Sequence, residues 1–544
     1  MKTYDVLIVG AGPTGLTAAS LLGNMGISTL IIEKNATTST IPKAIMIDDE
    51  GIRISQSFGL EQEVLKVVVP AGGAEYFGNS KKPFTRVLPK VGKFGYYPRN
   101  KFLQGEFEKV LHKGLKKFQS VQQSFNTELV SFTQDDSNVV AQLFDLRENK
   151  EYTVQAKYLL ACDGGRSTVR KQLGIQLVDI VKDKNGSSFE EPWIIVDLKN
   201  DPLKSRHTAF YCNPPRPSMN ASTGAGIRRY EFMLLDGESD EEMLKDENLA
   251  KLLEPHLPYN PNDVVKKAVV RFNALVAEKF QENRVLLLGD AAHLTPPFAG
   301  QGLNSGLRDA SNVAWKIAEI VKGNLKHTIL ASYEVERREH VVAMIKLAVM
   351  MGSFILTTSK KRQIVRDIAF GFFSIIPPLK RYVSEMRFKP KPICKDGLFI
   401  DLKQHENTYV GSMIPQAQFL EQSGQFKRLD DILGSDFALI KVGGPEVKFP
   451  NGCENLWDGI KVKKVSAYPF DDIPHPAKNE IVFTDTENIF KPYEGKILFV
   501  RPDRYVAGIF SPEEFDTFKE KIKNTFHVDH DKKGIEYEPI SIAN

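Results

Sequence analysis

The sequence YDVLIVGAGPTGLTAAS, residues 4–20, combines a strand pattern, a glycine-rich turn and a helix pattern. Asp5 to Val9 form an apolar run typical of a buried strand, and Leu16 to Met25 show the apolar spacing of a helix. A second strand pattern, Ser28 to Ile32, follows directly and ends at Glu33. This order of strand, glycine turn, helix and strand predicts a dinucleotide-binding βαβ unit.

The glycine turn, residues 10–15, has the GxGxxG spacing of a phosphate-binding loop. Gly10 allows the tight turn, Gly12 lets the backbone reach a pyrophosphate, and Gly15 lets the helix pack on the strand. Glu33 lies 18 residues after Gly15, close to the ~20 typical of the acid that binds an adenosine ribose. Because Glu33 would repel a 2′-phosphate, the pattern favours FAD or NAD in this slot and leaves those two open.

The overall composition is that of a globular chain with several domains. Its 544 residues are too many for one ordinary core and predict two to four domains. Hydrophobic residues make up 42% and the net charge is +4, with no block of five like charges. We therefore expect no nucleic-acid partner. The first strand begins so early that it leaves no room for a signal peptide.

The four cysteines are far apart and form no CxxC motif. This spacing argues against a disulfide framework or a zinc cluster, so we expect no metal centre and a cytoplasmic location. The most membrane-like stretch is Val341 to Thr358, but Lys346 interrupts it and it is shorter than the ~20 apolar residues of a membrane span. We expect a buried helix there and no stable membrane insertion.

Two later segments help to choose between the two dinucleotides. YLLACDGGRSTVR, residues 158–170, is a strand pattern that ends at Asp163. RVLLLGDAAHLTPPFAGQGLNSGLRDASNVAW, residues 284–315, is another strand that ends at Asp290 and leads through a Pro-Pro loop into a glycine-rich helix start. Such a carboxylate can hold ribityl hydroxyls, and the N–H groups of a helix start stabilise the negative charge of a reduced flavin. NAD alone has no use for this last segment, so flavin is favoured.

These three segments, in this order and spacing, resemble those of the class A flavoprotein monooxygenases, which share the p-hydroxybenzoate hydroxylase fold. Within that family the chain most resembles the 3-(3-hydroxyphenyl)propionate hydroxylase and phenol hydroxylase subgroup, over roughly residues 1 to 390. The resemblance implies an α/β fold, in which a Rossmann-like FAD-binding domain is interleaved with a β-sheet substrate domain and followed by a thioredoxin-like α/β domain. The expected bounds are 1–174 and 281–390 for the FAD-binding domain, 175–280 for the substrate sheet and 391–544 for the C-terminal domain.

The resemblance also implies which residues hold FAD. Relatives commonly have Arg where this chain has Lys43, and Lys lacks the planar fork for two-pronged contacts. Gln104 matches a glutamine that contacts FAD in relatives. The expected FAD-binding residues are Gly10, Gly12, Pro13, Thr14, Gly15, Glu33, Lys34, Lys43, Gln104, Asp163, Gly164, Arg166, Gly289, Asp290, Pro297, Gly300, Gly302, Leu303 and Asn304.

The reaction implied by the resemblance is hydroxylation of a small phenolic compound, for example a hydroxyphenylpropionate-like acid. NADH or NADPH would bind transiently and reduce tightly bound FAD, and O2 would add to give a flavin C4a-hydroperoxide. We expect Asp48 to handle the phenol proton, and Pro296 and Pro297 to form the wall beside the flavin. A substrate carboxylate would require an arginine, for which Arg216, Arg228 and Arg229 are candidates. His207 is a candidate base, and the family suggests a homodimer.

Other functions fit parts of the same pattern. A flavin-dependent halogenase would carry a WxWxIP segment, whereas Trp193, Trp315 and Trp457 stand alone. A hydroxylase or epoxidase of a larger polycyclic or isoprenoid substrate would differ in pocket size, which sequence does not give. A non-catalytic FAD-binding interaction protein would not need every flavin-facing segment. The C-terminal domain lacks CxxC, so we expect a packing role and no dithiol chemistry.

Overall fold

The computed structural model describes residues 1–38, 43–182, 188–224, 226–355, 357, 359–402, 409–416, 418–421, 424–453, 456, 460, 462–469 and 481–527. Trp457 and the end of the predicted C-terminal domain, residues 528–544, lie outside these ranges. The chain divides into two compact units. Unit 1 comprises Met1–Ser311, Arg338–Pro392 and Pro415–Ala417, and unit 2 comprises Asn312–Arg337, Ile393–Ile414 and Gln418–Asn544.

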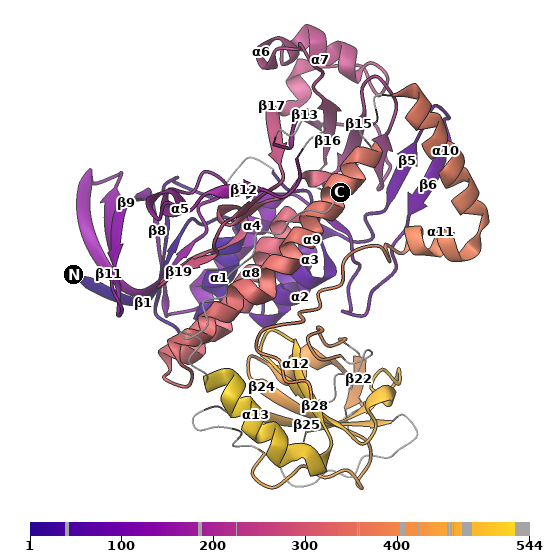
Figure 1. The fold of residues 1–544 in the computed structure, drawn as a ribbon. Coiled ribbons are helices and arrows are strands. Elements are labelled where there is room, and N and C mark those ends of the chain that lie inside the picture. Colours follow the sequence, from indigo (N-terminus) through magenta and orange to yellow (C-terminus); the bar gives the residue numbers. More distant parts are fainter. Residues whose placement is uncertain are drawn as a thin grey trace. The chain divides into compact units, whose positions relative to one another are not determined.

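The main sheet of unit 1 has a parallel core in the order β20-β11-β1-β2-β8. An antiparallel strand, β19, pairs with β20, and an antiparallel pair, β9 and β10, continues from β11 (Figure 1). Parallel strands that are buried on both faces carry continuous apolar runs, and β1 contains such a run. The strands are β1 (Lys2–Val9), β2 (Thr29–Glu33), β8 (Val121–Phe125), β9 (Thr127–Gln134), β10 (Val139–Asp145), β11 (Lys150–Ala161), β19 (Gln281–Glu282) and β20 (Val285–Leu287).

The βαβ unit predicted from the first glycine turn is confirmed. Helix α1 (Pro13–Asn24) joins β1 to β2, which pair in parallel with Val9 opposite Ile32. Pro13 occupies the first turn of α1, where a missing N–H group costs no hydrogen bond. The helix therefore begins directly after Gly12, with its N-terminus at the carboxyl end of the sheet.

A second large sheet in unit 1 has the order β17-β13-β16-β15-β14-β5-β6. Its antiparallel part lies within the predicted substrate sheet. Two further strands, β5 and β6, come from residues 74–87 and join this sheet through the parallel pairing of β5 with β14. That long-range pairing has no local signal in the sequence. The strands are β5 (Ala74–Phe77), β6 (Pro83–Val87), β13 (Glu190–Lys199), β14 (Thr208–Tyr211), β15 (Ser218–Ser222), β16 (Ile227–Met233) and β17 (Val264–Asn273).

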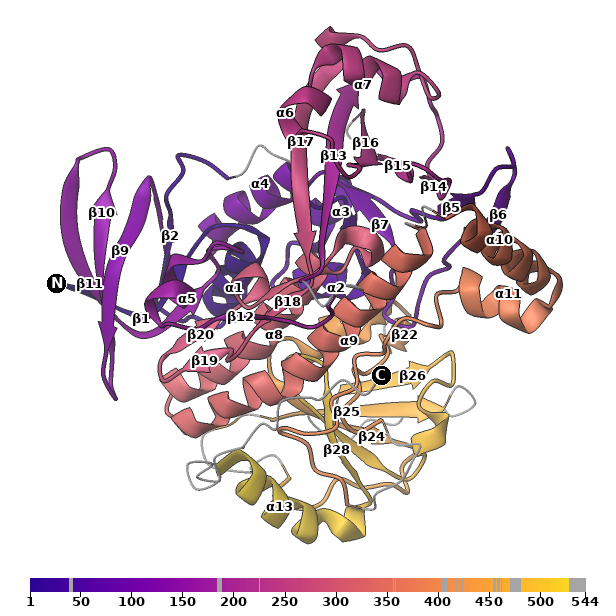
Figure 2. The ribbon, with the colours of Figure 1, turned by 45° about the horizontal axis from the view of Figure 1, so that its top comes forward.

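Two small sheets, β12-β18-β21 and β3-β7-β4, complete the strands of unit 1. Their strands are β3 (Met46–Ile47), β4 (Val68–Val69), β7 (Asn100–Phe102), β12 (Leu177–Asp179), β18 (Leu275–Ala277) and β21 (His293–Leu294). The helices that belong wholly to this unit, besides α1, are α2 (Asp49–Ser57), α3 (Glu61–Lys66), α4 (Gln104–Gly114), α5 (Thr168–Gln172), α6 (Asp240–Met243), α7 (Asp246–Leu253), α10 (Lys360–Ile375) and α11 (Pro377–Ser384). Helices α10 and α11 both pack beside β6 (Figure 2).

Two long helices, α8 (Gly302–Val321) and α9 (Ala331–Ile355), contribute residues to both units. The buried helix expected around Val341 is the second half of α9. Among the described residues, no single helix has both the length and the apolar character to cross a membrane. By length and composition alone, one sharply bent pair, His327–Ile355 with Lys360–Phe373, could do so.

Unit 2 contains a mixed sheet with the order β23-β22-β26-β25-β24-β27-β28. The extra α/β domain expected at the C-terminus is thus confirmed, and the strand predicted at Phe437 to Val442 is β24. The elements are β22 (Gln418–Glu421), β23 (Phe426–Arg428), β24 (Phe437–Val442), β25 (Val462–Pro469), β26 (Ile481–Asp485), β27 (Ile497–Val500), β28 (Val506–Phe510), α12 (Leu429–Leu433) and α13 (Phe515–His527).

Candidate active site

The predicted cofactor motifs meet at one edge of the main sheet. Gly10, Asp163 and Gly289 each lie just beyond the carboxyl end of a strand, namely β1, β11 and β20, and Glu33 is the last residue of β2. These four strands are neighbours and parallel, with Val9 opposite Ala161 and Ala161 opposite Leu287. Carboxyl ends of parallel strands are where open α/β sheets bind ligands.

The glycine turn is packed so closely that side chains are excluded at two of its positions. Gly10 has φ +101°, and a Cβ there would lie 2.5 Å from the carbonyl oxygen of Cys162. A Cβ on Gly15 would lie 2.0 Å from the carbonyl oxygen of Gly10. At Gly12, by contrast, a Cβ would meet nothing within 4 Å, because this glycine faces open space. The Glu33 carboxylate accepts the Ala11 N–H at 3.0 Å and so fixes the turn against β2.

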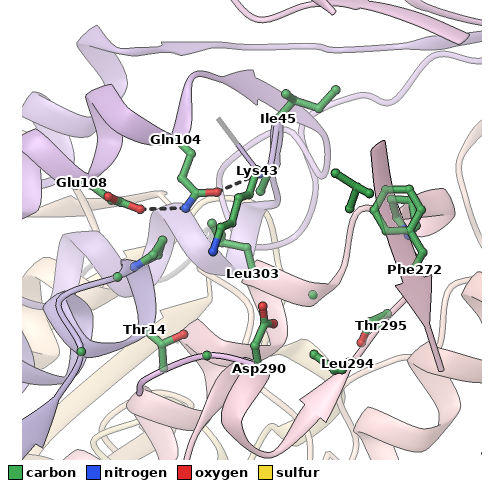
Figure 3. Close-up of a pocket in the computed structure, with 18 of the residues that line it drawn as sticks. Thr14, Lys43, Ile45, Gln104, Glu108, Phe272, Asp290, Leu294, Thr295 and Leu303 are labelled. Carbon is green, nitrogen blue, oxygen red and sulfur yellow. Dashed lines mark hydrogen bonds between the residues drawn. The ribbon is translucent and has the colours of Figure 1, made fainter. Parts of the chain in front are cut away.

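A cavity of about 740 Å³ opens at this edge, and it extends towards the second sheet (Figure 3). Most of the predicted FAD-binding residues lie on its wall. They are Gly10, Gly12, Pro13, Thr14, Glu33, Lys34, Lys43, Gln104, Asp163, Gly164, Arg166, Asp290, Pro297, Gly300, Gly302 and Leu303.

The Gly289-Asp290 turn is held from behind by a buried carboxylate on α8. Asp309 accepts the Gly289 N–H at 3.0 Å and lies 2.7 Å from Nε2 of His293. Asp309 thus holds both His293 and the backbone of Gly289, and the next residue, Asp290, lies on the cavity wall. The side chain of Asp290 is exposed to the cavity, but the surrounding protein still buries it enough to raise the pKa of its carboxyl group. The nearby His293 and Lys43 oppose that rise in pKa.

The chain segment opposite Asp290 is fixed by its backbone. Gln104 accepts the Ala44 N–H at 2.7 Å and donates to Glu108 at 2.7 Å. Arg229 donates to the carbonyl of Lys43 at 2.7 Å. Figure 3 shows that Lys43 and Asp290 project into the same cavity from opposite walls. Arg229, one of the three predicted substrate arginines, lies on the wall, and so does Glu108, which the sequence pattern did not mark.

The second sheet contributes both charged and apolar residues to the cavity wall, and the apolar ones gather around the Pro-Pro loop. Trp193 lies edge-on to Phe298, with ring centroids 5.9 Å apart, and Phe210, Met219 and Ile355 complete this wall. Phe298 follows the Pro-Pro loop, whereas the other residues come from distant strands and from α9. Strand alternation could have marked Phe210 and Met219 as inward-facing, but not as neighbours of the loop.

Some predicted residues support the cavity from behind its wall. Asn304 donates to the carbonyl of Gly300 at 2.8 Å and accepts the Asp48 N–H at 3.0 Å, so it joins the glycine-rich helix start to the segment before α2. Gly15 and Gly289 are close-packed turn residues. Pro296 precedes the wall residue Pro297. The contribution of Asn304, Gly15 and Gly289 to FAD binding stays a prediction, and so does the place of Pro296 in the wall beside the flavin.

The structure gives Asp48 another role than the predicted proton transfer. It caps α2 by accepting the Gly51 N–H at 3.0 Å, and it pairs with Arg308 and, at 2.9 Å, with Lys389. The two cations hold the pKa of the buried Asp48 carboxyl well below its usual range. A carboxylate so engaged is a weak base, and Asp48 is not on the cavity wall. Its proton-transfer role has no support in this geometry.

Three of the predicted substrate residues, Arg216, Arg228 and His207, also lie off the cavity wall. Arg216 pairs with Glu238, donating to it at 2.8 Å. Arg228 is buried against Asp201 at 3.1 Å. His207 abuts Gly73, where a Cβ would meet its ring. Sequence could not reveal these pairings, because each partner lies 22 or more residues away.

The residues on the wall fit the shape and polarity of FAD. The open space at Gly12 lies at the N-terminus of α1, where N–H groups favour a pyrophosphate. Asp163 uses one carboxylate oxygen to accept the Thr168 N–H at 2.7 Å, while its other oxygen is buried with no partner within the described part of the chain. Buried polar atoms are normally hydrogen-bonded, so this oxygen is suited to a cofactor hydroxyl. Glu33 and Asp290 supply further acceptors.

Unit 1 combines a parallel sheet that carries the glycine turn, a second sheet beside it and a flavin-sized cavity between them. This combination defines an FAD-dependent monooxygenase. Residues 3–348 match the FAD binding domain family, to which the chain belongs. Residues 411–525 match the HcaD C-terminal domain. FAD is the cofactor of this class, as the resemblance implied.

Curated relatives match almost the whole chain. The 3-(3-hydroxy-phenyl)propionate/3-hydroxycinnamic acid hydroxylase of Klebsiella pneumoniae subsp. pneumoniae is 37% identical over 94% of this chain and 92% of its own length. The enzyme of the same name from Comamonas testosteroni is 34% identical over 96% of this chain and 97% of its own. The flavin-dependent monooxygenase PieE, in complex with FAD and substrate, has the same fold, with a TM-score of 0.75 and 18% identity, covering 96% of this chain and 99% of that one.

Replacing Asp290 with alanine should weaken FAD binding about tenfold or more, because a charge-assisted hydrogen bond contributes roughly 1.5–3 kcal/mol. The dissociation constant is measured by titrating FAD into apoprotein and following flavin fluorescence. Asp290→Asn keeps an acceptor of the same size and should bind FAD better than the alanine variant. Wild-type affinity in Asp290→Ala would show that this carboxylate does not contact the cofactor.

Proposed function

We propose that this enzyme hydroxylates a small phenolic acid, of the hydroxyphenylpropionate or hydroxycinnamate type, with O2 and with NADH or NADPH as the reductant. The observation that carries the proposal is the identity of 34–37% with relatives of that name over nearly the full length of the chain. The cavity supports it, because an apolar chamber for an aromatic ring adjoins the polar wall of the FAD site.

In this proposal the protein binds, orients and shields the reactants. When bound, FAD supplies the redox chemistry with O2. Phe298 and Trp193 pack beside the ring position and exclude water from it. The carbonyl of Pro297 accepts the Gly300 N–H at 2.8 Å and keeps a second lone pair, which is available to a phenol hydroxyl.

NAD(P)H oxidation by the purified yellow protein tests the proposal. NADH and NADPH oxidation, peroxide release and product mass are measured with 3-(3-hydroxyphenyl)propionate, 3-hydroxycinnamate, unsubstituted phenol and a polycyclic phenol. We expect the acids to stimulate oxidation and to give a product heavier by one oxygen atom, with little peroxide. Turnover of only the polycyclic phenol would favour the larger-substrate alternative, and a chlorinated product formed in the presence of chloride would favour a halogenase.

Two further parts of the proposal concern the state of the protein. The family resemblance favours a homodimer, which light scattering of the purified protein would test. The scattered cysteines favour a cytoplasmic location. Cell fractionation would test it.

A further inference from the structure

Arg99 places a buried positive charge on the wall of the cavity. The residue immediately precedes β7, and its side chain is only 7% exposed. Its Nε donates to the carbonyl of Gly72 at 3.2 Å. No carboxylate of the described residues lies within ion-pair distance of its guanidinium, and Arg99 lines the cavity. The side chain thus has donors left for a group that enters the cavity.

Two other buried arginines of unit 1 that belong to the second sheet are neutralised within the protein. Arg228 pairs with Asp201 at 3.1 Å, and Arg229 pairs with Asp197 at 2.8 Å. Burying a charge without a partner is costly, and proteins normally pair it. At Arg99 this cost persists unless a ligand supplies the anion. Burial accordingly lowers the pKa of Arg99, and the Tyr76 phenol opposes that fall.

A second cation strengthens the positive character of this end of the cavity. Lys101, two residues further on, is 1% exposed, and its Nζ has no hydrogen-bond partner within the described ranges. Burial, with repulsion from Arg99 and Arg228, lowers the pKa of Lys101 to about 7. Lys101 does not reach the wall itself. In its protonated form Lys101 adds to the potential that an anion beside Arg99 would experience.

An aromatic row connects Arg99 to the proposed position of the substrate ring. Tyr76, whose phenol interacts electrostatically with Arg99, stacks on Phe210 with ring centroids 4.9 Å apart. Phe210 belongs to the same apolar cluster as Trp193 and Phe298, beside the Pro-Pro loop. Arg99 and the apolar residues Trp193, Phe210 and Phe298 thus line the same cavity.

We propose that Arg99 binds the carboxylate of the aromatic acid while the ring lies in the apolar chamber, which makes Arg99 the residue that selects acids over neutral phenols. The inference rests on the proposed function and deepens it. A planar guanidinium suits this task, because it can donate two parallel hydrogen bonds to one carboxylate.

The test compares 3-(3-hydroxyphenyl)propionate with its uncharged amide, which has the same ring and chain length. Wild-type enzyme loaded with FAD should bind the acid at least tenfold more tightly than the amide, measured by the change in flavin absorbance without reductant. In Arg99→Gln the KM for the acid should rise about 10- to 100-fold, and the KM for the amide should stay within about twofold. FAD content should remain that of the wild type.

Arg216→Gln is the matched control, because Arg216 pairs with Glu238 and lies off the wall; it should leave the preference for the acid unchanged. Equal binding of acid and amide by the wild type would overturn the role of Arg99 even if Arg99→Gln failed to fold. An unchanged ratio of the two KM values in Arg99→Gln, or loss of FAD from it, would also overturn that role. The proposed function itself would fail separately, if the wild type hydroxylated neither compound.

Discussion

Replacing Gly15 with alanine should yield a protein that purifies without FAD. The new Cβ would lie 2.0 Å from the carbonyl oxygen of Gly10 and 3.2 Å from the side chain of Cys162, so α1 must move away from β1. Such a shift displaces the N–H groups that face the pyrophosphate. The ratio of absorbance at 450 nm to that at 280 nm, followed by FAD titration, measures the loss.

Two further glycine variants separate a cofactor effect from a folding effect. Gly371 lies in α10, where a Cβ would meet nothing within 4 Å, so Gly371→Ala should retain FAD. In Gly12→Ala the methyl group would enter the space assigned to the cofactor without touching protein. This variant should lose FAD affinity while its apoprotein melts at the wild-type apoprotein temperature. A yellow Gly15→Ala protein with normal FAD affinity would contradict the close packing of the turn.

Replacing Glu336 with glutamine should destabilise unit 2 by about 3–5 kcal/mol. Glu336 accepts from Arg501 at 2.7 and 2.9 Å and from Lys316 at 3.0 Å, and all three side chains are fully buried. It also accepts the Leu398 N–H at 2.9 Å. Without its charge the two cations would keep, among the described residues, only Asp503 as a close anion. Thermal unfolding followed by circular dichroism should show a midpoint lower by about 10 °C.

The pH dependence of this effect gives a second readout. Arg501 and Lys316 hold the pKa of Glu336 well below its usual range, so the native carboxylate stays charged where the unfolded one takes up a proton. Its contribution is complete above the unfolded pKa of about 4.3 and is lost as the pH falls below that value. The stability difference between wild type and Glu336→Gln should therefore narrow in acid. The control is Lys322→Gln, which breaks an exposed pair with Glu319 and should cost at most about 1 kcal/mol of stability. An equal loss of stability in both variants would argue against a special role for the buried cluster.

The cofactor half of the site was readable from sequence because its signals are local. Gly10, Gly15 and Glu33 lie within one βαβ unit, whose spacing is set by the length of a strand, a turn and a helix. The segments ending at Asp163 and Asp290 were found in the same way, as apolar strands that stop at a carboxylate. The parallel order of β20, β11, β1 and β2 then brings these strand ends to one edge.

The substrate half was not readable in that way, because it depends on pairings between distant segments. Arg216 and Arg228 were chosen as arginines near a predicted sheet, yet each is matched by a carboxylate within the fold. Whether an arginine is paired depends on which strands become neighbours, and a charge pattern along the chain does not determine that. The sequence by itself thus determined the dinucleotide unit and, with the family resemblance, the flavin class. Only the tertiary structure, by burying Arg99 at the cavity with no carboxylate of the described residues beside it, singled out the group that we propose for an acidic substrate.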